Sequence, residues 1–183
     1  ASLRRILNEV QPDEIYHLAA QSHVRLSFDM PEYTVETIVN GTLKLLETVR
    51  ELQLPCRIYN ACSSEIFGAS PPPQNELTPL HPRSPYAAAK AFTYHIAKHY
   101  REAYGLFVVN GILFNHVSVK QNETFLVRKV TRAVGRIAEG LQKQLFLGNL
   151  DARRDWGYAQ EYCIGMQRIL RHNTAKDLVI GTG

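Results

Sequence analysis

The sequence has no long hydrophobic runs. None of its 183 residues lie in a stretch of the roughly 18 consecutive apolar residues that a membrane-spanning helix needs. The first segment, Ala1 to Pro12, carries too many charges for the apolar core of a signal peptide. We therefore expect a soluble, cytoplasmic protein without membrane contact. At 45% hydrophobic and 21% charged, the composition suits one globular domain with a buried core.

Cysteine is scarce, and charge of one sign does not accumulate. The three cysteines, Cys56, Cys62 and Cys163, show no Cys-x-x-Cys spacing. This pattern favours neither a disulfide framework nor a metal site. The net charge of +4 comes from basic residues scattered among acidic ones, without interleaved aromatics. That distribution does not support nucleic-acid binding, whereas it is compatible with a phosphate-bearing small molecule.

Short apolar runs alternate with amphipathic stretches, and there are no internal repeats. Runs rich in β-branched and aromatic residues predict strands over Glu14 to Ala20, Arg57 to Ala61 and Leu106 to Phe114. Apolar residues at helical spacing predict helices over Thr37 to Leu52 and Pro85 to Tyr104. This alternation predicts an α/β fold, a parallel sheet with helices on both faces.

Prolines gather between the two predicted helices. Pro71 to Pro73 and Pro79 to Pro85 predict a loop inside one domain. In parallel sheets, ligands bind beyond the carboxyl ends of the strands. The small and polar segments that follow the predicted strands are therefore the candidate site lining: Ala19 to Ser22, Cys62 to Glu65, and Asn115 with His116.

Tyr86 and Lys90 stand four residues apart at the start of a predicted helix, so their side chains share one face. A lysine ammonium beside a phenol favours the phenolate, and we expect it to lower the pKa of Tyr86 so that the phenol can act as a base. Ser63, at the end of a strand, is placed to share a substrate oxygen with the phenol. The alternatives are a surface Tyr–Lys pair and a serine that satisfies backbone groups.

Glu65 follows Ser63 by two residues. If this segment is extended, both side chains point into the same cleft. A carboxylate there can remove a carbon-bound proton next to a ketone, a step that separates a dehydratase from a simple oxidoreductase or epimerase. The alternative is a solvated loop glutamate.

Several longer segments also carry a resemblance to a known family. In chain order they are Leu18 to Val24, Ser63 to Gly68, Pro82 to Tyr86 with Lys90, Asn110 to His116, and Gly148 to Gly157. They resemble segments of the GDP-mannose 4,6-dehydratases, lyases of the extended short-chain dehydrogenase/reductase group. The segments follow the family's order and cover nearly the whole chain.

The resemblance implies a Rossmann-like fold that is partial here. Residues 1–120 would form the C-terminal part of an NADP-binding domain, and residues 121–183 a partial substrate-binding region with returning Rossmann elements. It also implies NADP as cofactor, GDP-mannose as substrate and a homo-oligomer at full length. The cofactor contacts that it implies are Leu18, Ala19, Ala20, Gln21, Ser22, Tyr33, Lys90 and His116.

Ser63, Tyr86 and Lys90 resemble the family's Ser/Thr-Tyr-Lys triad, with Ser63 where threonine is usual. The resemblance implies that Tyr86 takes the proton of the sugar C4 hydroxyl during oxidation and that Glu65 then takes the C5 proton. Water leaves from C6, with a proton from Glu65 or Ser63, before hydride returns there. Contacts to the substrate phosphates or base are expected from Asn115, Lys129 and Arg154, although Arg154 also suits a surface salt bridge.

The sequence departs from the family at Val117 to Asn122, where Glu-Ser-Pro-Arg-Arg-Gly is usual. Gln121 replaces an arginine used on the cofactor, so we expect one weaker phosphate contact. The Gly-rich phosphate loop is not among these residues, so we expect a fragment that is inactive alone and self-associates through uncovered surfaces.

Two alternatives remain open at this stage. One is another nucleotide-sugar epimerase or reductase, which needs Ser63, Tyr86 and Lys90 but not Glu65. The other is a non-catalytic remnant or interaction subunit that pairs with a full-length dehydratase.

Overall fold

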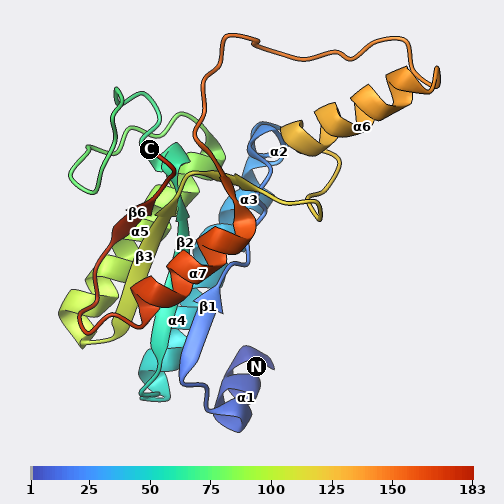
Figure 1. Ribbon diagram of the computed structural model, residues 1–183. Helices are drawn as coiled ribbons and strands as arrows, with labels where there is room; N and C mark the ends of the chain where they lie inside the picture. Colours follow the sequence, from blue (N-terminus) through green and yellow to red (C-terminus); the bar gives the residue numbers. More distant parts are fainter. Residues whose placement is uncertain (1) are drawn as a thin grey trace.

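A parallel sheet forms the centre of the molecule in the computed structural model, which describes residues 2–183 (Figure 1). Within these residues the main sheet has four strands in the order β1-β2-β3-β6. Their bounds are β1 Glu14–His17, β2 Arg57–Ser63, β3 Phe107–Leu113 and β6 Leu178–Ile180. Every neighbouring pair is parallel, with Ile58 opposite both Ile15 and Val108.

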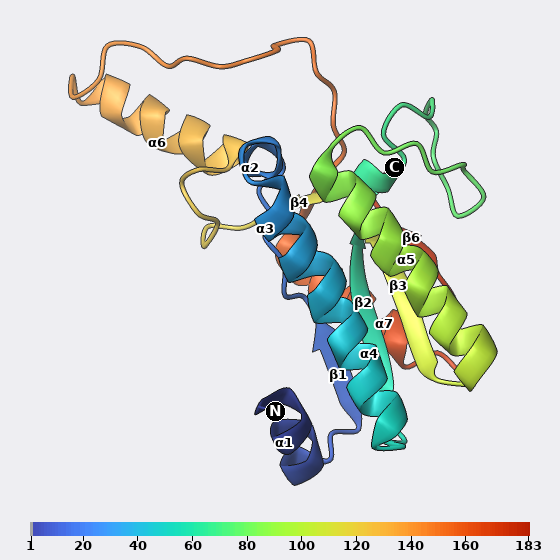
Figure 2. The same ribbon diagram turned by 180° about the vertical axis from the view of Figure 1, so that it is seen from behind.

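Helices α1 (Ser2–Val10), α4 (Gly41–Glu51) and α5 (Pro85–Tyr104) pack against one face of this sheet. Their shared core contains Leu46 and Val49 of α4, Ala97 of α5, and Ile58 and Val108 of the strands. Burial of one such Leu or Val side chain contributes about 1.5–3 kcal/mol. Figure 2 shows α4 and α5 side by side over β2 and β3.

Helix α7 (Ala159–Leu170) covers the opposite face (Figure 1). Its Tyr162, Met166 and Leu170 pack against Tyr59 and Val109, whose side chains leave the strands on that side. The structure therefore confirms the predicted parallel α/β sheet with helices on both faces.

The predicted strands and helices are present, but their bounds differ. β1 ends at His17, three residues before the predicted end, whereas β2 continues to Ser63. Before α4, the chain is already helical through α2 (Val24–Asp29), α3 (Pro31–Val35) and the π-helix η1 (Glu36–Asn40). The spacing of apolar residues did not predict these helices, because polar residues, Ser27 and Thr34, occupy fully buried positions in them.

The proline-rich segment, residues 67–84, is the predicted loop, and it folds back on the end of β2. The His81 amide donates to the Ile66 carbonyl (2.9 Å), and the Ala69 amide donates to the His81 carbonyl (3.1 Å). Gly68 has φ +51°, and a Cβ atom there would lie 1.9 Å from the His81 carbonyl oxygen. Only glycine suits this position, which brings the start of α5 back to the end of β2.

After β3 the chain leaves the main sheet. β4 (Asn115–Val117) pairs in parallel with β5 (Trp156–Tyr158), and between them lies α6 (Leu126–Ala138), which stands apart from the sheet (Figure 1). The chain then returns through α7 and β6. The division into domains at residue 120 stays a prediction. None of the described helices is both long and apolar enough to cross a bilayer.

Candidate active site

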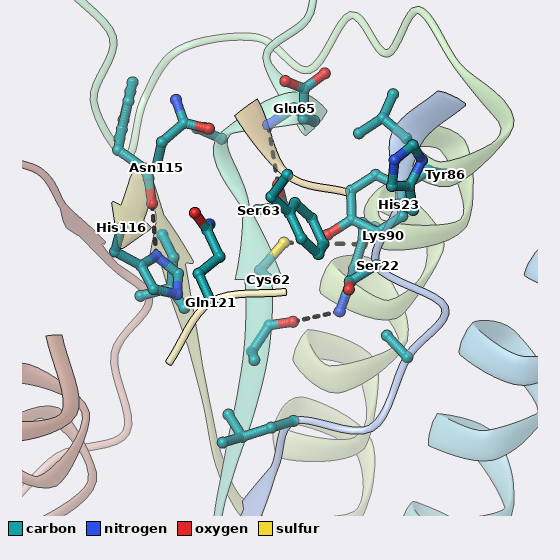
Figure 3. Close-up of a pocket in the computed structure, with 18 of the residues that line it drawn as sticks. Ser22, His23, Cys62, Ser63, Glu65, Tyr86, Lys90, Asn115, His116 and Gln121 are labelled. Atoms are coloured by element: carbon teal, nitrogen blue, oxygen red, sulfur yellow. Dashed lines mark hydrogen bonds between the residues drawn. The ribbon is translucent and has the colours of Figure 1, made fainter. Parts of the chain in front are cut away.

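A cavity of about 530 Å³ opens at the carboxyl ends of β1, β2 and β3 (Figure 3). It is the place where a parallel sheet of this kind binds ligands. The sequence-predicted residues that line it are Leu18, Ala20, Ser22, Ser63, Glu65, Tyr86, Lys90, Asn115 and His116. Segments from all three strand ends therefore meet in one cavity, as expected.

The start of α5 places Tyr86 and Lys90 in this cavity. Ser84 caps the helix, its Oγ accepting from the Ala87 amide at 3.0 Å, and Pro85 occupies the first turn. Both choices favour a helix start at this residue. Tyr86 and Lys90, one turn apart, are 8% and 6% exposed, and both side chains line the cavity.

Lys90 is tied to strand β2. Its Nζ donates to the Ala61 carbonyl at 2.7 Å and lies 6.0 Å from the ring centroid of Tyr86. Burial lowers the pKa of this ammonium. The surface-pair alternative is therefore wrong, because both side chains are buried.

Burial raises the pKa of Tyr86 to about 12, and the Ser63 hydroxyl beside the phenol opposes this rise. The expected lowering of the Tyr86 pKa by Lys90 is thus wrong for the protein as it stands. The reason is that desolvation of a phenolate outweighs the stabilising contacts in this buried place. Ser63 and Tyr86 nevertheless face each other, as the sequence predicted.

Glu65 reaches the cavity by a different route from the expected one. The segment is not extended, because Ser64–Ile66 forms a 3-10 turn, η2. Ser63 caps this turn, with its Oγ accepting from the Glu65 amide at 3.3 Å. The turn keeps Glu65 beside Ser63 at the edge of the cavity (Figure 3).

Asn115 and His116 form the opposite wall. The Nδ1 of His116 lies 2.9 Å from the Phe114 carbonyl oxygen. Since a carbonyl only accepts, Nδ1 carries the proton in the neutral ring and Nε2 is left as an acceptor. The ring stacks on Tyr162 at 4.7 Å between centroids, which fixes its orientation.

Other predicted site residues do not line the cavity, and their roles stay predictions. Gln21 is buried and donates to the Thr34 hydroxyl at 2.9 Å, so it holds the loop after β1 against α3. Ala19 is exposed, and Tyr33 is 52% exposed on α3. Lys129 donates to the Phe146 carbonyl at 2.9 Å, and Arg154 donates to the Arg153 carbonyl at 2.8 Å.

Sequence reasoning missed several lining residues. His23 caps α2 by accepting from the Leu26 amide, and its ring lies 5.6 Å from that of Phe125. Phe125 and Trp156 come from segments distant in the chain, and no local motif announces them. Among the described residues, no group of His, Cys, Asp and Glu could hold a metal ion.

Gln121 also lines the cavity, at the place where an arginine was expected from the resemblance. In the described part of the chain, its buried Oε1 has no hydrogen-bond partner. The amide brings no charge to the cavity, and the weaker phosphate contact stays a prediction.

Comparison with known proteins identifies the family of this chain. A family model described as GDP-mannose 4,6 dehydratase matches residues 1–183. The chain is 52% identical over 186 residues to GDP-mannose 4,6 dehydratase 2 of Arabidopsis thaliana, covering 100% of this chain and 50% of the relative. It is also 52% identical to the GDP-mannose 4,6-dehydratase of Vibrio cholerae, over the same shares. The chain thus spans about half the length of the curated relatives it matches.

Solved structures agree with the fold. RMD from Pseudomonas aeruginosa complexed with NADPH superposes with a TM-score of 0.88 at 28% identity, over 94% of this chain and 60% of that one. DesIV, a dTDP-glucose 4,6-dehydratase from Streptomyces venezuelae with NAD and TYD bound, gives 0.86 at 30% identity, over 100% and 55%. The sheet is therefore Rossmann-like. With a family model that matches its whole length, the chain belongs to the GDP-mannose 4,6-dehydratase family.

Proposed function

We propose that this chain supplies the catalytic residues of an NADP-dependent lyase that converts GDP-mannose to GDP-4-keto-6-deoxymannose. The observation that carries the proposal is the convergence of Ser63, Glu65, Tyr86 and Lys90 on one cavity. A base for a hydroxyl proton and a separate carboxylate for a carbon-bound proton are the two groups that oxidation and elimination require.

The cavity suits the nicotinamide and ribose of NADP. Leu18, Ala20 and Met166 provide apolar surface for a flat ring, while Lys90 still has N–H groups beyond the one given to Ala61. A nicotinamide held there supplies the acceptor and donor of hydride. The neighbour RMD was solved with NADPH, which supports the same choice here.

Oxidation at C4 needs a base at the hydroxyl. Tyr86 takes this proton as the base. The Ser63 hydroxyl beside it favours the phenolate, and the Lys90 Nζ lies 6.0 Å from the ring centroid. Burial opposes phenolate formation and, at the same time, keeps water away from the reacting hydroxyl.

Elimination needs a second base at C5. A ketone at C4 acidifies the C5 proton, and Glu65 lies next to Ser63 in the same cavity as Tyr86. Glu65 takes the C5 proton, and the C6 hydroxyl leaves as water after it is protonated by Glu65 or Ser63. The hydride removed from C4 then returns to C6, and C5 takes up a proton, which gives the 6-deoxy product and restores the oxidised cofactor. The sugar diphosphate then extends past Asn115 toward the first turn of α6, where unpaired amides favour an anion.

The test uses a chimera in which these 183 residues replace the matching half of the Vibrio cholerae relative. Incubated with GDP-mannose and NADP, the chimera should form a product that lacks one water and carries solvent deuterium at C5. The unaltered relative serves as the positive control. A product that retains the C6 hydroxyl would instead indicate an epimerase or reductase, and bound NADP without any product would indicate a non-catalytic chain.

A further inference from the structure

Two buried asparagines face each other in the sheet, beneath the site. Asn60 of β2 and Asn110 of β3 are register partners, 2% and 0% exposed. The Nδ2 of Asn60 donates to the Oδ1 of Asn110 at 2.7 Å. Burial of two amide side chains in the middle of a sheet costs free energy unless both are hydrogen-bonded, so their hydrogen-bond partners are important.

Both amides also reach the backbone of helix α5. Asn60 Nδ2 donates to the Thr93 carbonyl at 3.3 Å, and Asn110 Nδ2 donates to the Tyr94 carbonyl at 3.2 Å. These carbonyls already belong to the helix, and each has a second lone pair for such a donor. Consecutive carbonyls of α5 are thus attached to adjacent strands.

Asp177, just before β6, completes the attachment. Its Oδ1 accepts from the backbone amide and the Nδ2 of Asn110, both at 3.0 Å. Its Oδ2 pairs at 2.8 Å with Arg101, which lies in the last turn of α5. The network therefore holds α5 at its middle and near its end.

The apolar part of this helix–sheet contact comes from both small and large side chains. Ala97 and Tyr100 of α5 pack in one core with Ile58 and Val108 of the strands, and Tyr94 packs with Ile112. Apolar attraction is non-directional, so it opposes a shift along the helix axis less sharply than directional contacts do. Hydrogen bonds have narrow limits of distance and angle, and they resist such a shift.

The network lies close to the reacting groups on both elements. Asn60 precedes Ala61, whose carbonyl binds Lys90, and β2 ends at Ser63. Thr93 follows Lys90 by one helical turn, and its hydroxyl donates to the Lys90 carbonyl at 2.9 Å. A shift of α5 by one residue is about 1.5 Å, which would separate Tyr86 from Ser63.

We propose that Asn60 and Asn110 are positioning residues that fix α5 along the sheet and so set the place of Tyr86 relative to Ser63. This inference rests on the function proposed above. The amides do not touch the substrate. They act through the helix, and their removal lowers turnover without changing how the substrate is held.

The test replaces both amides at once in the chimera, as Asn60→Leu with Asn110→Leu. Leucine has a similar volume, and loss of both partners together leaves few unpaired groups, so stability should change little. A misplacement of about 1 Å costs on the order of 100-fold in rate. We expect kcat to fall by about 100-fold, while KM for GDP-mannose stays within about twofold of the parent value.

Tyr59→Phe is the matched control, since Tyr59 is the neighbour of Asn60 in β2, is fully buried, and has a hydroxyl without a partner in the described residues. This control should keep both kcat and the thermal midpoint. If the double variant does not fold, Asn60→Leu alone decides, because it leaves the Asn110–Asp177 contacts in place.

An unchanged kcat in a folded variant overturns the inference, and so does a loss of kcat that only follows a loss of thermal stability. If the parent chimera has no dehydratase activity, both the proposed function and this inference are wrong. If the parent is active and the double variant is equally active, only this inference is wrong.

Discussion

The Nζ of Lys90 donates to the carbonyl of Ala61 at 2.7 Å, which ties the second turn of α5 to the strand that ends at Ser63. The Lys90 side chain is only 6% exposed, and burial lowers its pKa. Ser63, Tyr86 and Lys90 are therefore held in fixed positions relative to one another, although they come from a strand and a helix separated by a long loop.

Removal of the Tyr86 hydroxyl tests whether this residue is the base. In the chimera, Tyr86→Phe should lower kcat by about two to four orders of magnitude, the range for loss of a general base. Substrate binding should change little because the ring stays in place. Steady-state kinetics with GDP-mannose measure both quantities. Near-parental turnover would reject Tyr86 as the base.

Local patterns predicted part of the site well. The four-residue spacing of Tyr86 and Lys90 survives in the structure because Ser84 and Pro85 start the helix beside them. Glu65 was placed beside Ser63 for a wrong reason, since a 3-10 turn replaces the expected extended segment. The backbone conformation of this segment was predicted wrongly. Ser63 and Glu65 are only two residues apart, so both still line the same cavity.

Long-range features were beyond the sequence. Trp156 lies on β5, which pairs with β4 beside the cavity, and Phe125 caps α6, so both are distant in sequence from the other lining residues. The low exposure of Tyr86 likewise depends on tertiary packing. The raised pKa of Tyr86 depends on that burial, which no motif encodes. Asn60 and Asn110 looked like ordinary strand residues until the register placed them face to face.

His17 predicts a pH dependence of stability. At the end of β1, its Nε2 lies 3.0 Å from the Thr42 hydroxyl oxygen. Burial, together with the charge of Lys90, lowers the pKa of His17 from 6.5 to about 4. Because the folded pKa lies below the unfolded one, this neutral histidine stabilises the fold fully above pH 6.5, and the contribution is lost as the pH falls toward 4.

The size of this effect is on the order of 3 kcal/mol for a shift from 6.5 to about 4. His17→Gln keeps an N–H donor for Thr42 but does not titrate. Thermal midpoints measured from pH 8 down to 4 should fall further for the parent chain than for this variant. Parallel curves would show that His17 is not held neutral by the fold.

Gly111 predicts a steric limit in β3. A Cβ atom at this position would lie 1.8 Å from the Tyr59 hydroxyl oxygen, and Tyr59 is fully buried. Gly111→Ala should therefore destabilise the fold by about 1–3 kcal/mol through overpacking. Gly41→Ala is the matched control, because nothing lies within 4 Å of its Cβ position and its backbone is helical. Denaturant unfolding should separate the two, and equal stability would show that Tyr59 moves freely.

Glu65 gives the sharpest prediction, because it separates elimination from oxidation. In the chimera, Glu65→Gln keeps the shape of the side chain and the backbone hydrogen bond to Ser63, since that bond uses the amide of residue 65. Gln cannot accept the C5 proton. Oxidation at C4 should continue through Tyr86, so bound NADPH should accumulate while water is not eliminated. The C5 proton should then no longer exchange with deuterated solvent, a loss that nuclear magnetic resonance of the sugar detects. Tyr86→Phe is the opposite control, because it should prevent the formation of NADPH altogether. Exchange at C5 and product formation at parental rates would show that Glu65 takes no part, and another group would then have to supply the second base.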